Sequence, residues 1–278
     1  MKLTCFHNTY RSQATPENFR GDLVLLHGWG LHSIVWDSLI PELLNNYQVT
    51  VIDLPGMGQS PLPRGGYTLE SLVERVLEVC PEQATFLGWS LGGIVAQRIA
   101  CQAPDRVKQL VTIASTPKFC ASDDWPYGIA TEVIDSFLQM YEEDAEGTLI
   151  RFLALQCKDG AHYRQDVETL KRILYFCGLP APKALREGLL ILRSSDLRDE
   201  QAHIQCPTLH ILGQNDNLIP VALASAWEKL APTHRFAIMD GCSHALFLSD
   251  PEWVMQIIRQ ELFALDSTTK PSADTNLD

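Results

Sequence analysis

The stretch ATFLGWSLGGIVAQRIA, from Ala84 to Ala100, changes from a strand-like to a helix-like pattern at a single serine. The apolar run before Ser90 predicts a buried strand, and the residues after it predict a helix. The five residues GWSLG (88–92) fit the pattern G-x-S-x-G, in which small neighbours leave room for a serine on a tight, strained turn. Such a turn lifts the hydroxyl above the sheet edge, beside a helix N-terminus that favours negative charge. We therefore predict that Ser90 is a nucleophile.

Other short apolar runs have the same character as the one before Ser90, and helical patterns separate most of them. None alternates cleanly between polar and apolar residues, so each predicts a strand buried on both faces. This alternation of strands and helices predicts an α/β fold, with a mostly parallel sheet and helices on both faces. The predicted strands lie within Asp22–Gly30, Tyr47–Gly58, Ala84–Ser90, Val107–Ser115, Pro207–Asp216 and His234–His244, and the predicted helices are Thr68–Cys80, Leu91–Pro104, Val221–Leu230 and Pro251–Leu265.

The alternation of strands and helices is interrupted between residues 117 and 195. Several helical patterns follow one another there without a convincing strand. We therefore expect one α/β core from residues 1–116 and 196–265, with residues 117–195 as a helical insertion. An insertion between two strands of an open α/β sheet lies over the carboxyl edge, where ligands bind, so we expect it to act as a lid. The polar stretch from residue 266 to 278 is expected to be disordered.

A serine hydroxyl becomes a good nucleophile only when a histidine removes its proton and a carboxylate orients that histidine. In a strand–serine–helix fold the expected chain order is serine, acid, histidine. Asp216 and His244 each follow a predicted strand, so both are expected at the same sheet edge as Ser90. Asp240, at the end of the last predicted strand, is the alternative acid. We predict a triad of Ser90, Asp216 and His244.

The negative oxygen that forms during acyl transfer needs two hydrogen-bond donors. One is expected to be the backbone N–H of Leu91, which follows the nucleophile, and the other the backbone N–H of Trp29 in an earlier strand-end loop. Two glycines of that loop, followed by Asp53, imitate part of a dinucleotide-binding fingerprint. Ser33 stands where the third glycine would be, so Asp53 is better explained as the organiser of a turn.

Composition and charge disfavour several classes of function. The 278-residue chain has a net charge of −12, which disfavours nonspecific binding to nucleic acid or anionic membranes. No apolar run is long enough to cross a bilayer, and the N-terminus lacks the pattern of a secretory signal, so we expect a cytoplasmic protein. The eight cysteines lack the spacing of a disulfide framework or a zinc site. We expect no metal and no cofactor.

Several motifs resemble a known family. LLHGWG (25–30), DLPGMGQS (53–60), LGWSLGG (87–93) and GCSHALF (241–247) are similar to motifs of the α/β-hydrolase superfamily. Within the insertion and directly after it, DDWP (123–126), RFLALQ (151–156) and DLR (196–198) resemble the carboxylesterases of biotin synthesis, which remove the methyl group from pimeloyl-acyl-carrier-protein methyl ester. The resemblance covers residues 23–251 and narrows the fold class to an α/β-hydrolase fold with a helical lid.

The resemblance implies roles for particular residues and a partner. The substrate is carried by an acyl carrier protein, and the enzyme itself is expected to be a monomer. The implied site consists of Ser90, Asp216 and His244 as the triad, Trp29 and Leu91 as the oxyanion hole, Trp29 and Phe152 along the acyl channel, and Arg151 and Arg164 as basic contacts to the carrier.

The charge of the insertion is divided along its length. Residues 122–146 include eight acidic and no basic side chains, whereas residues 147–193 include eight basic and four acidic ones. The basic part could steer an acidic carrier protein, or it could simply be a solvated helix surface. Glu168 stands one turn from Arg164, at a position where the family tends to be basic. Contact with the carrier would then shift towards Lys171 and Arg172.

Three alternatives to the specific esterase remain open. A general short-chain carboxylesterase and a carbon–carbon bond hydrolase would use the same three residues. A ligand-binding receptor would keep the hydrolase fold without turnover. Fold and triad alone do not determine the substrate.

Overall fold

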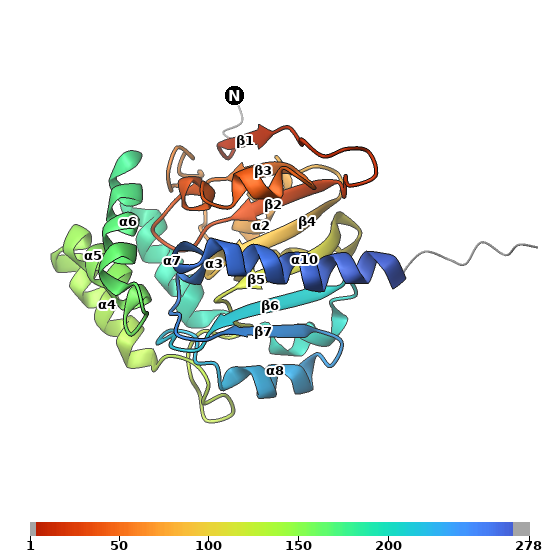
Figure 1. Cartoon of the computed structure of the whole chain (residues 1–278). Coiled ribbons are helices and arrows are strands. Elements are labelled where there is room, and N and C mark those ends of the chain that lie inside the picture. Colours follow the sequence, from red (N-terminus) through yellow and green to blue (C-terminus); the bar gives the residue numbers. More distant parts are fainter. Residues whose placement is uncertain (1–3, 269–278) are drawn as a thin grey trace, which may run out of the picture.

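A seven-stranded sheet forms the centre of the computed structural model, which describes residues 4–268 (Figure 1). Its elements, in chain order, are β1 (His7–Tyr10), β2 (Asp22–Leu26), η1 (Ser33–Trp36), α1 (Ile40–Leu43), β3 (Gln48–Ile52), α2 (Leu69–Leu77), β4 (Ala84–Trp89), α3 (Leu91–Gln102), η2 (Pro104–Arg106), β5 (Val107–Ile113), α4 (Thr131–Glu143), α5 (Ala145–Cys157), α6 (Tyr163–Phe176), α7 (Pro182–Ser194), η3 (Arg198–His203), β6 (Thr208–Gly213), α8 (Leu223–Leu230), β7 (Arg235–Met239), α9 (Leu246–Ser249) and α10 (Pro251–Thr268).

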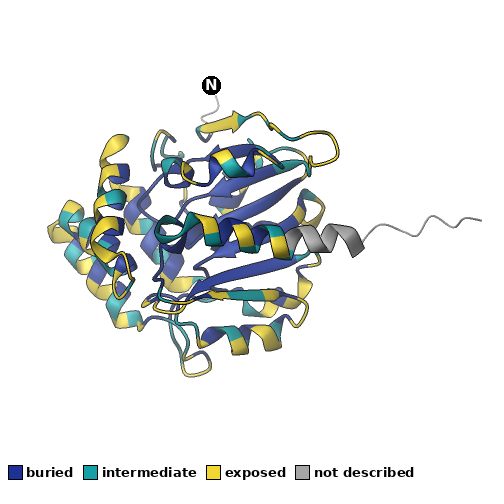
Figure 2. Ribbon diagram, in the orientation of Figure 1, coloured by how far each residue is buried: buried dark blue, intermediate teal, exposed yellow. Residues whose placement is uncertain are grey.

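The strands lie in the order β1-β3-β2-β4-β5-β6-β7, and every pair from β3 to β7 is parallel. All residues of β4 and β6 are buried, because helices cover both faces (Figure 2). One face carries α10, which crosses in front of the sheet in Figure 1, and α3 packs against β2, β4 and β5 from behind. The predicted α/β fold with a mostly parallel, helix-covered sheet is confirmed.

Among the strands of the described residues, β1 is the one that the sequence did not predict. It pairs antiparallel with β3, from His7 opposite Ile52 to Tyr10 opposite Val49. Its residues HNTY are mostly exposed, so they carry no hydrophobic pattern, and backbone hydrogen bonds to β3 hold them in place. The predicted strands are present but shorter than the apolar runs, because the glycine-rich ends of those runs form loops at the carboxyl edge.

Helix α2 shows how local sequence sets the boundary of an element. The Thr68 side chain accepts a hydrogen bond from the Ser71 N–H at 3.2 Å, and the Ser71 hydroxyl accepts one from the Thr68 N–H at 2.9 Å. This reciprocal cap satisfies two N–H groups that the first turn leaves without partners. The helix then buries one stripe, formed by Leu69, Leu72, Val73 and Val76.

Four helices occupy the region of the predicted insertion, between β5 and β6. Helices α4 to α7 gather beyond the end of the sheet where β5 stops (left in Figure 1). The two stems of the insertion run side by side, since Lys118 forms an antiparallel bridge with Asp196 and the Leu197 N–H donates to the Pro117 carbonyl at 2.8 Å. The helices are thus attached to the core at the edge where the strand-end loops lie.

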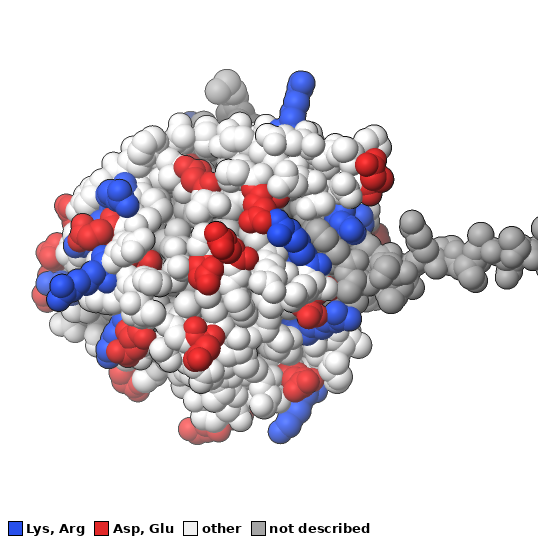
Figure 3. Space-filling view, viewed as in Figure 1, with Lys and Arg blue, Asp and Glu red and all other residues white. Residues whose placement is uncertain are grey.

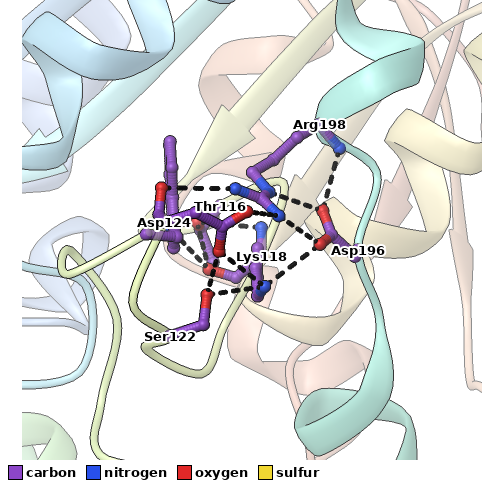
Figure 4. Close-up of polar contacts among 7 residues, drawn as sticks. Thr116, Lys118, Ser122, Asp124, Asp196 and Arg198 are labelled. Atoms are coloured by element: carbon purple, nitrogen blue, oxygen red, sulfur yellow. Dashed lines mark hydrogen bonds and ion pairs between the residues drawn. The ribbon is translucent and has the colours of Figure 1, made fainter.

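A polar cluster ties these two stems together (Figure 4). The Lys118 ammonium lies 3.1 Å from the Asp196 carboxylate and donates to the Ser122 hydroxyl at 2.8 Å. The Arg198 guanidinium contacts Asp196 through two nitrogens, each at 2.8 Å, and Asp124 at 2.9 Å. Two cations therefore face two carboxylates, and Arg198 is joined to Asp124, 74 positions earlier in the sequence. We call these residues the stem cluster.

Removing one carboxylate of the stem cluster is expected to loosen the insertion in a pH-dependent manner. Hydrogen bonds from Arg198 lower the pKa of the Asp196 carboxyl to about 2. A lowered pKa means that the stabilisation is complete above the unfolded-state value of about 4 and is lost as the pH falls towards 2. For Asp196→Asn we expect the free energy of unfolding to fall by about 1 kcal/mol at neutral pH, a modest value because the side chain is partly exposed. Urea denaturation of both proteins at several pH values measures this. Equal stability losses at pH 7 and pH 2.5 would contradict the account.

The C-terminal helix is longer than predicted, because α10 runs to Thr268 and not to Leu265. The prediction of disorder is therefore wrong for residues 266–268, which belong to α10. The rest of that segment, residues 269–278, lies outside the described residues. Within the described part of the chain, none of the helices is both long and apolar enough to span a membrane.

Candidate active site

Ser90 occupies the turn between β4 and α3, as the sequence predicts. Its backbone has φ 54° and ψ −118°, a left-handed conformation that is strained for a residue with a side chain. Hydrogen bonds hold the turn, because the Ser90 N–H donates to the Ile113 carbonyl at 3.0 Å and its carbonyl accepts from the Ser115 hydroxyl at 2.9 Å. The serine is therefore fixed at the N-terminus of α3 by contacts from the end of the neighbouring strand β5.

The glycines beside Ser90 are required by close approaches of the backbone. A Cβ atom at Gly92 would lie 2.5 Å from the His27 carbonyl oxygen, and one at Gly88 would lie 2.6 Å from the Gly93 nitrogen. Neither position can accept a larger residue without moving backbone. The first turn of α3 thus packs directly against β4 and the end of β2, which sets the height of Ser90 above the sheet.

Asp216 and His244 lie in the loops after β6 and β7, and the structure brings them together. Asp216 Oδ2 is 2.8 Å from His244 Nδ1, and both side chains are fully buried. The other oxygen, Oδ1, accepts from the N–H groups of Leu218 at 2.8 Å and Ile219 at 3.0 Å. Both oxygens of the carboxylate therefore have hydrogen-bond partners. The alternative acid, Asp240, is exposed and accepts from the Gly241 N–H at 2.9 Å.

The contact with Asp216 determines which nitrogen of His244 carries the proton. A carboxylate accepts, so Nδ1 must donate, and Nε2 is left with a free lone pair. Nε2 is buried and has no hydrogen-bond partner among the described residues. The backbone of His244 is also fixed, because its N–H donates to the Gln156 carbonyl at 3.0 Å and its carbonyl accepts from Trp89 Nε1 at 3.0 Å. The second bond links the histidine loop to the residue before Ser90.

The two predicted oxyanion donors lie in neighbouring loops of the same edge. Leu91 is the first residue of α3, and Trp29 follows the end of β2, the strand beside β4. In the described part of the chain, neither backbone N–H donates to a backbone carbonyl in the loops or at the helix caps. The N–H groups of a first helical turn have no partner within the helix, so Leu91 offers a free donor next to Ser90.

Two buried residues brace the loop that carries Trp29. His27 accepts from the Leu54 N–H at 2.8 Å through Nε2 and donates to the Gly28 carbonyl at 2.8 Å through Nδ1. Burial lowers the pKa of this imidazole to about 4, so it is neutral at neutral pH. Asp53 accepts from the Ser33 N–H at 2.7 Å and the Gln59 N–H at 2.8 Å. Asp53 thus organises turns, as expected, and does not belong to a nucleotide site.

Aromatic residues connect the oxyanion loop to the insertion. The rings of Trp29 and Phe152 meet edge to face with their centroids 4.8 Å apart, and Phe137 also packs edge to face against Phe152 with centroids 5.2 Å apart. Trp29 Nε1 also donates to the Leu185 carbonyl at 2.8 Å. Helices α5 and α7 therefore contact one tryptophan of the core, α4 packs against Phe152, and together they build an apolar wall beside the strand-end loops.

The residues expected to contact a carrier protein lie on the outer surface of the insertion. Arg151 is exposed on α5, 3.9 Å from the exposed Asp144, and Arg164 is exposed on α6. Glu168 pairs with Lys171 at 3.1 Å. On the face drawn in Figure 3, acidic and basic side chains stand side by side over the insertion. Arg151, Arg164 and Glu168 are therefore all accessible from solvent.

Sequence reasoning missed the supporting residues of the site. The Gln156 carbonyl and the Trp89 indole N–H hold the main chain of the histidine loop, and the Ser115 hydroxyl holds the carbonyl of the turn at Ser90. One signal was available for Gln156, since it lies one turn after Phe152 on the same face of a helix. In the described part of the chain, no group of three His, Cys, Asp or Glu side chains is arranged to hold a metal ion.

A mostly parallel sheet with a serine at the turn between a strand and the following helix is the arrangement found in α/β hydrolases. The model of the Alpha/beta hydrolase family matches residues 23–257. The chain belongs to this family. An esterase from Exiguobacterium antarcticum has the same fold, with a TM-score of 0.81 over 92% of this chain and 94% of its own, at 21% identity.

Relatives with higher sequence identity narrow the resemblance further. The chain is 42% identical over 238 residues to the pimeloyl-[acyl-carrier protein] methyl ester esterase of Aeromonas hydrophila subsp. hydrophila, which covers 85% of this chain and 93% of the relative. It is 44% identical over 232 residues to the protein of the same name from Klebsiella pneumoniae (strain 342), covering 82% and 88%.

Proposed function

We propose that this protein is a serine carboxylesterase that removes the methyl group from pimeloyl-[acyl-carrier protein] methyl ester, a step in biotin synthesis. The observation that carries the proposal is the buried Asp216–His244 pair, which leaves His244 Nε2 as an acceptor at the sheet edge where Ser90 sits on its turn. The choice of ester is supported by the relatives of that name, which are more than 40% identical to this chain over more than 80% of its length.

In the acylation step, Ser90 Oγ attacks the carbonyl carbon of the methyl ester while its proton passes to His244 Nε2. The buried Asp216 carboxylate stabilises the resulting imidazolium through Nδ1. The backbone N–H groups of Trp29 and Leu91 stabilise the tetrahedral oxyanion. The bond to the methoxy group then breaks, His244 returns the proton to it, and methanol leaves an acyl group on Ser90.

In the second step, water hydrolyses the acyl-enzyme. The water oxygen attacks the acyl carbon, and one of the water protons passes to His244 Nε2. The bond between the acyl carbon and Ser90 Oγ then breaks as the serine regains a proton. The product is the free carboxylic acid at the end of the carrier-bound chain. Trp29 and Phe152 form the apolar wall along which the methylene chain lies, because their rings are in contact beside the oxyanion loop.

The carrier protein binds to the basic side of the insertion in this account. Arg151 and Arg164 are exposed and available to acidic side chains, whereas Glu168 neutralises Lys171 and repels an acidic partner. Arg172 is a further cation on α6, and its guanidinium donates to the Thr169 hydroxyl at 3.2 Å. Exposed charges of this kind affect association more than chemistry.

Reversing charges on α6 is expected to change KM for the carrier-bound ester in opposite directions. Arg164→Glu should raise KM about ten-fold at low salt, and Glu168→Arg should lower it several-fold, as one charge pair is lost or gained. Both changes should shrink as salt screens the surface. Steady-state kinetics with the carrier-bound ester measure the effect, and a short free ester serves as the control, since its kcat/KM should not change. Equal effects on both substrates would argue against carrier docking at α6.

A genetic experiment tests the proposed function in the cell. A biotin-requiring strain that lacks its methyl esterase should grow without biotin when it carries this protein, and should not grow with the Ser90→Ala variant. If the wild-type protein does not restore growth but cleaves short esters, the protein is a general esterase. Cleavage of a ring-fission diketone in preference to any methyl ester would indicate a carbon–carbon bond hydrolase instead.

A further inference from the structure

Gln156, the last residue of the RFLALQ motif, has a buried side chain for which the proposed mechanism gives no role. The residue is 2% exposed, and its Oε1 atom has no hydrogen-bond partner among the described residues. A buried amide oxygen without a partner is costly, and such groups in native proteins usually bind water or a ligand. The protein keeps this amide where a leucine or methionine would pack without that cost.

The surroundings place Gln156 at the candidate active site. Phe152 and Gln156 are four residues apart on α5, so they share one face of the helix. The ring of Phe152 touches Trp29 at 4.8 Å, and the Gln156 carbonyl accepts from the His244 N–H at 3.0 Å. The amide therefore projects from the helix face that meets both the oxyanion loop and the histidine loop.

Two unpartnered acceptors then lie on residues whose main chains are joined by a hydrogen bond. His244 Nε2 must accept because Nδ1 donates to Asp216, and Gln156 Oε1 accepts because it is a carbonyl oxygen. A water molecule has two hydrogens and can donate to both acceptors at once. Methanol has one hydroxyl hydrogen and can donate to only one of them. This pair of acceptors therefore distinguishes the nucleophile of the second step from the alcohol that leaves in the first.

We propose that Gln156 is a positioning residue that holds the water which hydrolyses the acyl-enzyme. The inference rests on the proposed function. The water donates one hydrogen to Gln156 Oε1 and the other to His244 Nε2, and its oxygen attacks the acyl carbon. The proton passes to Nε2, the carbon–Ser90 Oγ bond breaks, and Oγ takes the proton back, so the carboxylic acid leaves and the enzyme is regenerated. By favouring water over methanol, Gln156 also limits re-formation of the methyl ester.

The test separates the two steps with Gln156→Met, a change that keeps the length of the side chain and removes the amide. On a p-nitrophenyl ester, the burst of nitrophenol reports acylation and the steady rate reports deacylation. We expect the burst rate to stay within about two-fold and the steady rate to fall about ten-fold or more, the effect of one lost hydrogen bond in a transition state. Intact mass should show the acyl group accumulating on the protein, and added methanol should capture a larger share of it as methyl ester.

Thr148→Val is the matched control. Thr148 lies two turns before Gln156 on the same buried face of α5, and its hydroxyl also has no partner among the described residues. Both rates of this variant should stay near those of the wild type. Equal losses of burst and steady rate in Gln156→Met, an unchanged division between water and methanol, or the same defect in Thr148→Val would overturn the inference.

Labelling with a fluorophosphonate, which reacts with an activated serine, distinguishes a failure of the Gln156 proposal from a failure of the proposed function. Wild type and both variants should be labelled at Ser90. If the wild type is not labelled there, the serine mechanism is wrong and the inference falls with it. If all three proteins are labelled but methanol partitioning does not change, only the role of Gln156 is wrong.

Discussion

Ser90→Ala is expected to lower kcat/KM on any ester by about 10⁴- to 10⁶-fold, the loss seen when a nucleophile that acts as a unit with its base is removed. Alanine keeps the Cβ atom, so the strained turn at φ 54° and the close packing of the neighbouring glycines stay as they are. The melting temperature should therefore hardly change. Nitrophenol release and circular dichroism measure the two quantities on the same sample.

Ser136→Ala provides the control for this variant. Ser136 is exposed on α4, where its hydroxyl donates to the Glu132 carbonyl at 2.7 Å. The change should leave activity within about two-fold of the wild type, as surface substitutions usually do. Substantial esterase activity of a folded Ser90→Ala protein would show that another group performs the attack.

Asp216→Asn is expected to lower kcat/KM by about 10³- to 10⁴-fold because it reverses the tautomer of His244. An asparagine can still accept from the N–H groups of Leu218 and Ile219 through its carbonyl oxygen, so the loop keeps its shape. Its NH₂ group then faces His244 Nδ1, which must accept. The ring proton moves to Nε2, which no longer has a lone pair for the Ser90 proton. Steady-state kinetics and an NMR spectrum of the imidazole measure the loss and its cause.

Asp240→Asn is the matched control, because it makes the same change at the other candidate acid. Asp240 is exposed and bonds to the Gly241 N–H, away from His244 Nδ1. The activity of the Asp240→Asn variant should equal that of the wild type. A larger loss in Asp240→Asn than in Asp216→Asn would mean that the acid has been assigned to the wrong loop.

The placement of the candidate site could be predicted because each residue follows a strand. Parallel strands end at one edge, so Ser90, Asp216 and His244 were expected together, and the structure does join the last two. The glycines at 88 and 92 were also informative. In so tight a strand–turn–helix, the neighbouring backbone leaves no room for a side chain at either position. Short-range patterns and topology were sufficient for these features.

Other features depend on contacts that leave no pattern in the sequence. Strand β1 is held by backbone hydrogen bonds to β3, which any residue can make, and its side chains are mostly exposed. The stem cluster joins Lys118 and Asp124 to Asp196 and Arg198, across the whole insertion. Gln156 meets the histidine loop through a main-chain carbonyl. Only the folded chain shows such long-range partners.

The central claim is tested most directly by incubating the protein with pimeloyl-carrier protein methyl ester and measuring the mass of the carrier. We expect the carrier to lose the mass of one CH₂ group as methanol appears in equal amount, with no change under Ser90→Ala. A carrier that keeps its mass while short esters are cleaved, or that loses the whole acyl chain through its thioester, would contradict the account.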